Sequence, residues 1–148
     1  HFDLTALIMM KIRPFEISDT EPVVALWNEC GLTRSWNNPY LDIERKLKID
    51  PEWFVVGESN DVIVATAMFG YEGHRGWVNY LAVSPKHQRN GYARQLMQYG
   101  EELLLANGCP KLNLQVRETN AEALGFYAAL GYKIDASISL GKRLIPDE

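Results

Sequence analysis

Three strand-like segments follow one another between residues 53 and 83, and this run limits the possible folds more than any other feature of the chain. The first two segments, WFVVGES and VIVATAMFGY, are separated only by Asn60 and Asp61, which suit a tight hairpin turn. The turn EGHRG leads from the second segment into the third, WVNYLAV. Because connections this short join neighbouring antiparallel strands, the sequence predicts three antiparallel strands in a row.

Helical and strand patterns alternate on either side of this run. A strand and two helices are predicted before it, in residues 10–16, 20–30 and 41–49. After it come a helix, a strand, a second helix and two final strands, in residues 91–108, 111–116, 121–131, 132–137 and 138–144. The resulting order, βααβββαβαββ, predicts an α+β fold with a mixed, mostly antiparallel central sheet and helices on both faces.

Composition narrows the functional classes. The chain has 148 residues and a formal net charge of −4, so a nucleic acid is not an expected partner. No apolar run approaches the roughly 18 residues of a membrane span, so a membrane is not an expected partner either. Cys30 and Cys109 lie far apart without further metal-ligand spacing, which argues against a metal site or a disulfide and favours a cytoplasmic location. We expect a single domain over residues 10–148, with residues 1–9 a tag or leader because the first residue is a histidine.

Gly91 stands where the helix after the third strand should begin. A glycine within a helix costs about 1 kcal/mol relative to alanine, so its use here suggests that a ligand approaches the backbone closely. Free N–H groups at a helix N-terminus bind anions, and Arg89 and Arg94 would add charge-assisted hydrogen bonds to a phosphate. The pattern Q-x-x-G-x-A, from Gln88 to Ala93, therefore indicates a phosphate site, with helix packing as the alternative explanation.

A second motif makes the first one specific. The segment NAEALGFYAALGYK, residues 120–133, has the order N-x-x-A-x-x-F-Y-x-x-x-G-Y. With both motifs, their spacing and the order of elements from Met10 to Leu144, the chain resembles the GCN5-related N-acetyltransferase (GNAT) family. Within that family it is similar to small bacterial stand-alone enzymes, including the ribosomal-protein alanine acetyltransferases.

The resemblance implies acetyl-CoA as the cosubstrate and no metal. The glycine-containing loop would bind the pyrophosphate, and main-chain groups of the preceding strand would pair with the pantetheine arm beside a gap between two splayed strands. Asn120 would lie near the reactive end of the cofactor, although an N-cap role alone would explain this residue. The expected cofactor contacts are Leu81, Ala82, Val83, Gln88, Arg89, Asn90, Gly91, Tyr92, Ala93, Arg94, Asn120 and Phe126.

The resemblance also implies that Tyr127 donates a proton to the departing thiolate. A phenol with an unperturbed pKa near ~10 suits this task. The alternative is a core tyrosine whose hydroxyl makes a structural hydrogen bond. The sequence alone leaves both readings open.

The general base is the weakest part of the match. The positions where relatives carry a base hold Trp77 or Asn79, and Gln115, none of which takes up a proton at neutral pH. Glu72 is our candidate for a base that acts through water, with His74 and Glu118 as alternatives in the sequence. Loss of the amine proton to solvent would remove the need for any base.

The acceptor site is implied to lie between the first two helices, their connecting loop and the last hairpin. The expected acceptor contacts are Arg34, Trp36, Asn37, Tyr40, Tyr71 and Tyr80. Trp36 would equally serve to hold the two helices together. Aromatic faces with Glu72 would suit a cationic amine, whereas Arg34 would suit an acidic group, so the sequence does not choose among acceptors.

The predicted activity is acetyl-CoA-dependent acetylation of a primary amine, on a small molecule or a peptide N-terminus, by direct attack in a ternary complex. The alternative is a non-catalytic acyl-CoA sensor or interaction module, which the absence of an obvious base would favour. A homodimer is also expected, because the last predicted strand would expose Ile138 and Leu140 at a sheet edge.

Overall fold

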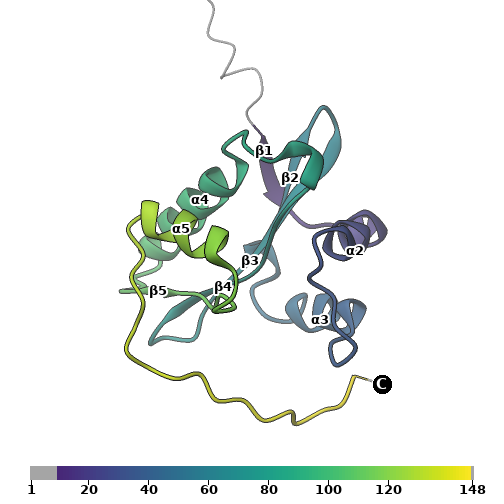
Figure 1. The fold of residues 1–148 in the computed structure, drawn as a ribbon. Helices are drawn as coiled ribbons and strands as arrows, with labels where there is room; N and C mark the ends of the chain where they lie inside the picture. The colour runs from purple at the N-terminus through teal and green to yellow at the C-terminus, as the bar shows by residue number, and fades with distance from the viewer. Residues whose placement is uncertain (1–9, 148) are drawn as a thin grey trace, which may run out of the picture.

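The computed structural model describes residues 10–147, which form a five-stranded sheet with the order β1-β2-β3-β4-β5 (Figure 1). The strands are β1 (Lys11–Pro14), β2 (Phe54–Ser59), β3 (Val62–Tyr71), β4 (Gly76–Val83) and β5 (Leu112–Asn113). The pairs β1–β2, β2–β3 and β3–β4 are antiparallel, and β5 runs parallel to β4. The predicted α+β class and the three consecutive antiparallel strands are confirmed. The predicted tag or leader, residues 1–9, lies outside the described residues.

Helices cover both faces of the sheet, as predicted (Figure 1). One face carries α2 (Thr20–Glu29) and α3 (Pro39–Lys46), and the other carries α4 (Tyr92–Ala106) and α5 (Ala121–Ala129). Three short 3-10 helices occupy Ile17–Asp19, Pro51–Trp53 and Pro85–His87. None of the helices in the described part of the chain is long and apolar enough to span a membrane.

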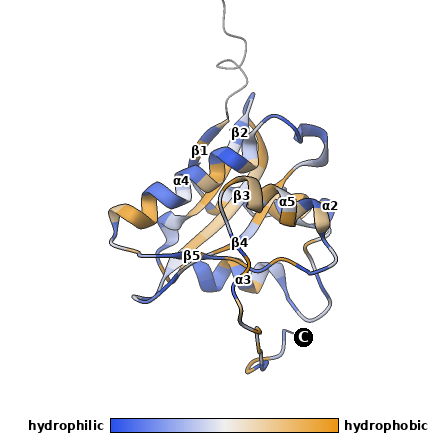
Figure 2. Cartoon of the chain, turned by 60° about the vertical axis from the view of Figure 1, so that its left-hand side comes forward, coloured by the Kyte–Doolittle hydropathy of each residue, from blue (hydrophilic) through white to orange (hydrophobic). Residues whose placement is uncertain are grey.

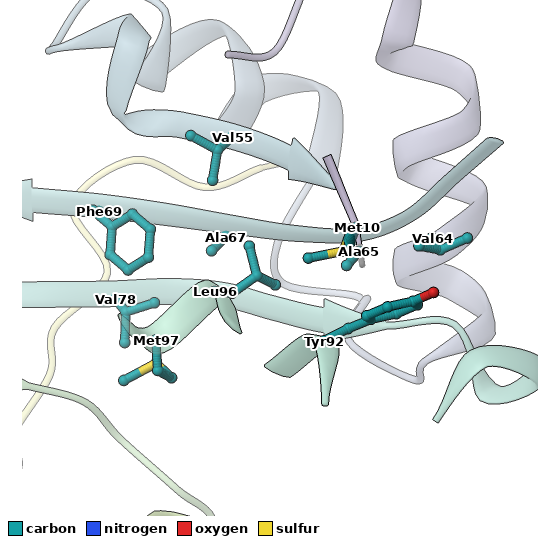
Figure 3. Packing of buried hydrophobic residues seen from close by; sticks show 10 residues of the cluster. All are labelled: Met10, Val55, Val64, Ala65, Ala67, Phe69, Val78, Tyr92, Leu96 and Met97. Carbon is teal, nitrogen blue, oxygen red and sulfur yellow. The ribbon is translucent and has the colours of Figure 1, made fainter. Parts of the chain in front are cut away.

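The core between the sheet and α4 depends on a close contact at Gly100. Leu96 and Met97 of α4 pack against β3 and β4 around Ala67 and Phe69 (Figure 3). A Cβ atom added at Gly100 would lie 2.0 Å from Cε1 of Phe69, so a glycine is needed for the helix to approach the strand this closely. Figure 2 shows the matching pattern along α4, where hydrophilic and hydrophobic residues alternate around the helix.

The core on the opposite face is organised around Trp27 of α2. Its indole ring stacks on Tyr80 at a centroid distance of 3.8 Å and lies 6.0 Å from the ring of Phe54. The indole Nε1 donates a hydrogen bond of 2.8 Å to Oγ1 of Thr66, which in turn donates to the main-chain oxygen of Tyr80 at 2.9 Å. This buried network fixes the backbone of β4 at Tyr80.

At Tyr80 the strand β4 departs from regular geometry. Tyr80 has a φ of +52°, and the pairing of β3 with β4 shifts register between Thr66 and Met68, which identifies a β-bulge. On its other edge β4 separates from β5 before it reaches Tyr80, since the two strands pair only at Gly76 and Trp77 of β4. The predicted gap between two splayed strands is therefore present.

The two final strands predicted in residues 132–137 and 138–144 are wrong. Residues 133–147, called the C-terminal arm from here on, contain no helix or strand and run from α5 past the end of the sheet to α3 (Figure 1). The predicted strand over 111–116 is also shortened to the two residues of β5. A strand requires a hydrogen-bonding neighbour along its length, and the alternating pattern of Ile134, Ile138 and Leu140 does not supply one.

Candidate active site

A cavity of about 480 Å³ opens where β4 and the chain after β5 diverge. Its walls come from the loop before α3, from α3, from β3 and β4, from the segment after β5 and from α5. The lining residues are Leu32, Asn37, Asp42, Met68, Val78, Asn79, Tyr80, Leu81, Leu114, Gln115 and Tyr127. This cavity, called the acceptor pocket below, brings together six of the residues discussed from sequence: Asn37, Asn79, Tyr80, Leu81, Gln115 and Tyr127.

The loop before α4 has the backbone expected of an anion site. Gly91 is the N-cap of α4 with a φ of +78°, and Arg89 also has a positive φ, of +67°. A glycine N-cap has no side chain to offer the N–H groups of the first turn, which an α-helix itself leaves without acceptors. A Cβ atom added at Gly91 would meet no atom within 4 Å, so packing does not require the glycine. The positive φ of Gly91 is what favours a glycine at this position, and the space beside the residue is open.

The side chains of this loop divide into two groups. Gln88, Arg89, Asn90 and Arg94 are exposed and point to no core contact. Tyr92, by contrast, is buried in the core beside α4 (Figure 3), and its hydroxyl donates to Oγ of Ser59 at 3.3 Å. The Tyr92 side chain is therefore not placed to meet a ligand, and of this residue only the main chain is left for that role.

Tyr127 lies on α5, packs against the core and is among the residues that line the acceptor pocket. The ring makes edge contacts with Phe126 and Tyr132, at centroid distances of 5.0 and 5.8 Å. Between residues 10 and 147 no hydrogen bond reaches the Tyr127 hydroxyl, although burial raises its pKa to about 12. The alternative of a structural hydrogen bond from this residue therefore finds no partner in the described chain.

Tyr80 and Asp42 form a polar pair on the opposite wall. The Tyr80 hydroxyl donates to Oδ2 of Asp42 at 2.7 Å, and Nη1 of Arg45 donates to Oδ1 at 3.1 Å. Burial, together with the Asp42 carboxylate, raises the pKa of Tyr80 well above its usual range. Asp42 is the only residue lining the pocket that is charged at neutral pH.

Glu72 is not placed with these residues. It lies in the exposed turn before β4, at the end of that strand remote from Leu81, and does not line the pocket. Its Oε1 accepts hydrogen bonds from the main-chain N–H groups of Arg75 and His74, at 2.6 and 2.7 Å, and these bonds lower its pKa. The geometry supports a turn-stabilising role for Glu72 and gives it no path to the pocket.

Four of the predicted acceptor contacts also lie elsewhere. The Tyr71 hydroxyl is directed to the main-chain oxygens of Gly73 and Gly108, beside Glu72. The other three belong to the loop before α3 and to α3 itself: Arg34 binds the main chain of its own loop, Trp36 is 56% exposed at the tip of that loop, and the Tyr40 hydroxyl donates to Glu21. The exposure of Trp36 also argues against its holding the helices together.

Two predicted cofactor contacts on the second motif have structural roles. Asn120 caps α5, with its Oδ1 accepting from the main-chain N–H of Ala123 at 3.0 Å. Phe126 is half-buried against the α4 side of the core. Leu81 lines the pocket, while Ala82 is buried on the α2 side of the sheet.

Sequence reasoning missed Asp42, Arg143 and Asp147. Asp42 lies on the first turn of α3, where an acidic residue reads as an ordinary helix-dipole partner. Arg143 and Asp147, which contact the same wall, are about a hundred residues away in the chain. Only the path of the C-terminal arm brings them to α3, and no local pattern signals it.

Comparisons of the sequence and of the fold identify similar proteins. A sequence model of the Acetyltransferase (GNAT) family matches residues 16–132. An acetyltransferase of Yersinia pestis (strain Pestoides F) is 50% identical over 139 residues, which cover 94% of this chain and 99% of that protein.

Solved structures share the fold at low sequence identity. The ribosomal-protein-S18-alanine N-acetyltransferase of Escherichia coli has a TM-score of 0.70 at 22% identity, covering 83% of this chain and 77% of that one. The PaiA N-acetyltransferase of Thermoplasma acidophilum, in complex with coenzyme A, has a TM-score of 0.70 at 15% identity, covering 88% and 93% of the two chains.

Proposed function

The chain belongs to the acetyltransferase (GNAT) family and is an N-acetyltransferase, and from this premise we propose that it transfers the acetyl group of acetyl-CoA to a primary amine by direct attack in a ternary complex. The observation that carries the proposal is Tyr127, which lines the acceptor pocket and whose hydroxyl has no hydrogen-bond partner between residues 10 and 147. The pocket opens beside the end of β4 that leads into the α4 loop.

The chain's own groups fit acetyl-CoA at two points. The open space at Gly91 and the first-turn N–H groups of α4 suit a pyrophosphate, with Arg89 and Arg94 exposed beside them. On the edge of β4 that faces β5, no strand of the described chain pairs with the residues after Trp77. The main-chain groups of this edge are therefore available to the amides of the pantetheine arm. Acetyl-CoA bound in this way supplies an acetyl group activated as a thioester.

Tyr127 supports the departure of the thiol. As the amine nitrogen bonds to the carbonyl carbon, the carbon–sulfur bond breaks and the thiolate takes up a proton, for which the Tyr127 hydroxyl is the donor. Its raised pKa keeps the phenol protonated at neutral pH. Because such a phenol is a weak acid, Tyr127 acts mainly by hydrogen bonding to the developing thiolate, and water restores any proton it gives up.

The pocket favours a positively charged acceptor. Asp42 supplies its one formal charge, while Asn79 and Gln115 present neutral amides at the positions where relatives carry a base. Amines are cations at neutral pH, so they are attracted to this wall, whereas acidic acceptors are repelled. No histidine lines the pocket, and both oxygens of its one carboxylate, Asp42, already accept hydrogen bonds from Arg45 and Tyr80. The extra proton of the amine therefore leaves to water.

A non-catalytic acyl-CoA sensor is the second candidate, favoured by the amides at Asn79 and Gln115. Release of free CoA thiol from acetyl-CoA separates the two when it is followed with a panel of amines that includes a diamine, an amino acid, a peptide and an aminoglycoside. The enzyme releases thiol in proportion to acetylated amine identified by mass spectrometry. Tight binding of acetyl-CoA without amine-dependent release would instead establish the sensor.

A further inference from the structure

The C-terminal arm touches the wall of the acceptor pocket at three separate places. Oγ of Ser139 accepts a hydrogen bond from the side-chain amide of Gln115. Nη1 of Arg143 donates to Oδ1 of Asn37 at 2.6 Å. Asp147 reaches the start of α3, where its Oδ2 accepts from the main-chain N–H of Asn38 at 2.9 Å. These contacts involve the segment after β5 and the loop before α3, which form two of the pocket walls.

Asp147 is the strongest of the three attachments. Its side chain is 0% exposed and accepts hydrogen bonds from both Nη atoms of Arg45, at 3.2 and 2.7 Å. Arg143 forms an ion pair with the same carboxylate at 2.6 Å. The hydrogen bond from Arg45 is the main cause that lowers the pKa of Asp147 far below its usual range, so the carboxylate stays charged at neutral pH.

Arg45 connects this attachment to the pocket. The same Nη1 atom that binds Asp147 also binds Asp42, which in turn accepts the hydroxyl of Tyr80. Asp147 therefore fixes the position of Arg45, and Arg45 fixes one oxygen of the only charged group lining the pocket. The chain of contacts runs from the arm to the acceptor side of the site without touching the α4 loop.

The arm is not held in place by burial of its apolar side chains. Ile138 and Leu140 are 89% and 91% exposed, and Ile134 and Leu144 are similarly open to solvent. The one ion pair earlier in the arm, between Asp135 and Lys111, is exposed on both sides, and such surface pairs contribute little. The attachment of the arm to the pocket wall consequently depends on its polar contacts, of which those of Asp147 are the most numerous.

We propose that the C-terminal arm is a clamp on the acceptor side of the site, in which Asp147 is a positioning residue that orients Asp42 through Arg45. This inference rests on the proposed function. It assigns a specificity role to the end of the chain: loss of the clamp weakens recognition of a cationic amine while leaving acetyl-CoA binding intact. The clamp and the cofactor loop are separate parts of the site.

The test compares Asp147→Asn with Asp135→Asn, a matched change on the same arm at an exposed ion pair. Asp147→Asn should raise the KM for the best amine of the panel about tenfold, which corresponds to about 1.4 kcal/mol, with kcat and the KM for acetyl-CoA within twofold of wild type. Asp135→Asn should change none of the three. A parallel rise in the KM for acetyl-CoA, or an equal effect of Asp135→Asn, would overturn the proposal.

Two further measurements exclude a merely structural effect. Arg45→Gln should reproduce the rise in amine KM, and the double variant should be no worse than either single variant, because the two residues act in one chain of contacts. Amide hydrogen exchange at Asn38, which needs no substrate, should accelerate in Asp147→Asn and stay unchanged in Asp135→Asn. Unchanged exchange at Asn38, or additive effects of the two substitutions, would contradict the clamp.

These outcomes are distinct from failure of the proposed function. If wild-type protein acetylates no amine of the panel, the proposed function fails and the specificity role of the clamp fails with it. If wild type turns over an amine and Asp147→Asn does so with unchanged KM, only the clamp is overturned.

Discussion

Tyr80 and Tyr127 both line the acceptor pocket, but their hydroxyls have different surroundings. Tyr80 donates to Asp42, so its hydroxyl is already committed to the wall. The Tyr127 hydroxyl has no partner in residues 10–147, although the ring is fixed by Phe126 and Tyr132. A hydroxyl without a structural hydrogen bond is available to a bound substrate, and for this reason the catalytic role is proposed for Tyr127 and not for Tyr80.

Tyr127→Phe removes the hydroxyl and keeps the ring contacts. Because general acid assistance contributes about 10²- to 10⁴-fold and the raised pKa weakens this acid, we expect kcat to fall about 10²-fold, at the low end of that range. The Kd for acetyl-CoA should change less than about threefold, since binding does not depend on the hydroxyl. Steady-state kinetics with calorimetry measures both quantities.

Tyr132→Phe is the matched control for this change. Its hydroxyl donates to Glu101 at 2.6 Å, so the substitution loses a hydrogen bond but no group that lines the pocket. We expect wild-type kcat in Tyr132→Phe. Wild-type kcat in both variants would show that Tyr127 is a packing residue.

Single residues of the site were predictable from sequence only where they belong to a motif. Gly91 and Tyr127 stand in the two segments that identify the family; Gly91 is the N-cap of α4 and Tyr127 lines the pocket, while their roles stay predictions. Glu72 was chosen for its chemistry alone, and it lies in a turn away from the pocket. Asp42 was missed because a carboxylate on the first turn of a helix is common, and its role depends on Tyr80 lying opposite.

At the scale of elements, α4 shows how a single glycine sets the distance between a helix and the sheet. Gly100 faces Phe69, and a Cβ atom there would lie 2.0 Å from the ring, which is itself buried at 1% exposure. Gly125 of α5 offers a contrast, since its Cβ position is open and its backbone is helical.

Gly100→Ala and Gly125→Ala should therefore change stability in opposite directions. Overpacking costs about 1–3 kcal/mol, which exceeds the gain of up to about 1 kcal/mol from replacing a helical glycine, so Gly100→Ala should lower the free energy of unfolding. Gly125→Ala should raise it by about 0.5–1 kcal/mol. Urea denaturation monitored by circular dichroism checks both, and a stabilised Gly100→Ala would refute the close contact.

Most elements were predictable because their patterns are local. The hairpin at Asn60 and Asp61 formed as expected, with both residues at positive φ, and the two central strands are buried on both faces. The final strands were not predictable, because alternation of apolar residues describes a strand's faces and not its partner. In the structure β5 has only two residues, Leu112 and Asn113, and residues 133–147 contain no strand that could extend the sheet beside it.

At the scale of the whole molecule, the exposed row on the C-terminal arm keeps the predicted homodimer as a testable expectation. Ile138 and Leu140 point to solvent while Ser139 contacts the acceptor wall, so one side of the arm is available to a second copy. We expect light scattering to give twice the 16.8 kDa mass of one chain at micromolar concentration. Ile138→Glu combined with Leu140→Glu should give monomers.

Leu105→Glu is the control for this substitution, because Leu105 is also an exposed leucine but lies on α4 and not on the C-terminal arm. It should leave the measured mass unchanged. A wild-type mass of one chain across the concentration range would rule out the dimer.

The central claim of this account is that acetyl-CoA binds with its phosphates at the N-terminus of α4, and calorimetric titration of acetyl-CoA into three proteins tests it most directly. Gly91→Glu and Gly108→Glu place the same side chain at the two ends of α4, at positive φ and with open space in both cases, so their backbone strain is matched. The account predicts that wild type and Gly108→Glu bind acetyl-CoA with similar Kd, while Gly91→Glu, folded by circular dichroism, shows no binding because its carboxylate occupies the phosphate site. An unchanged Kd in folded Gly91→Glu would contradict the claim.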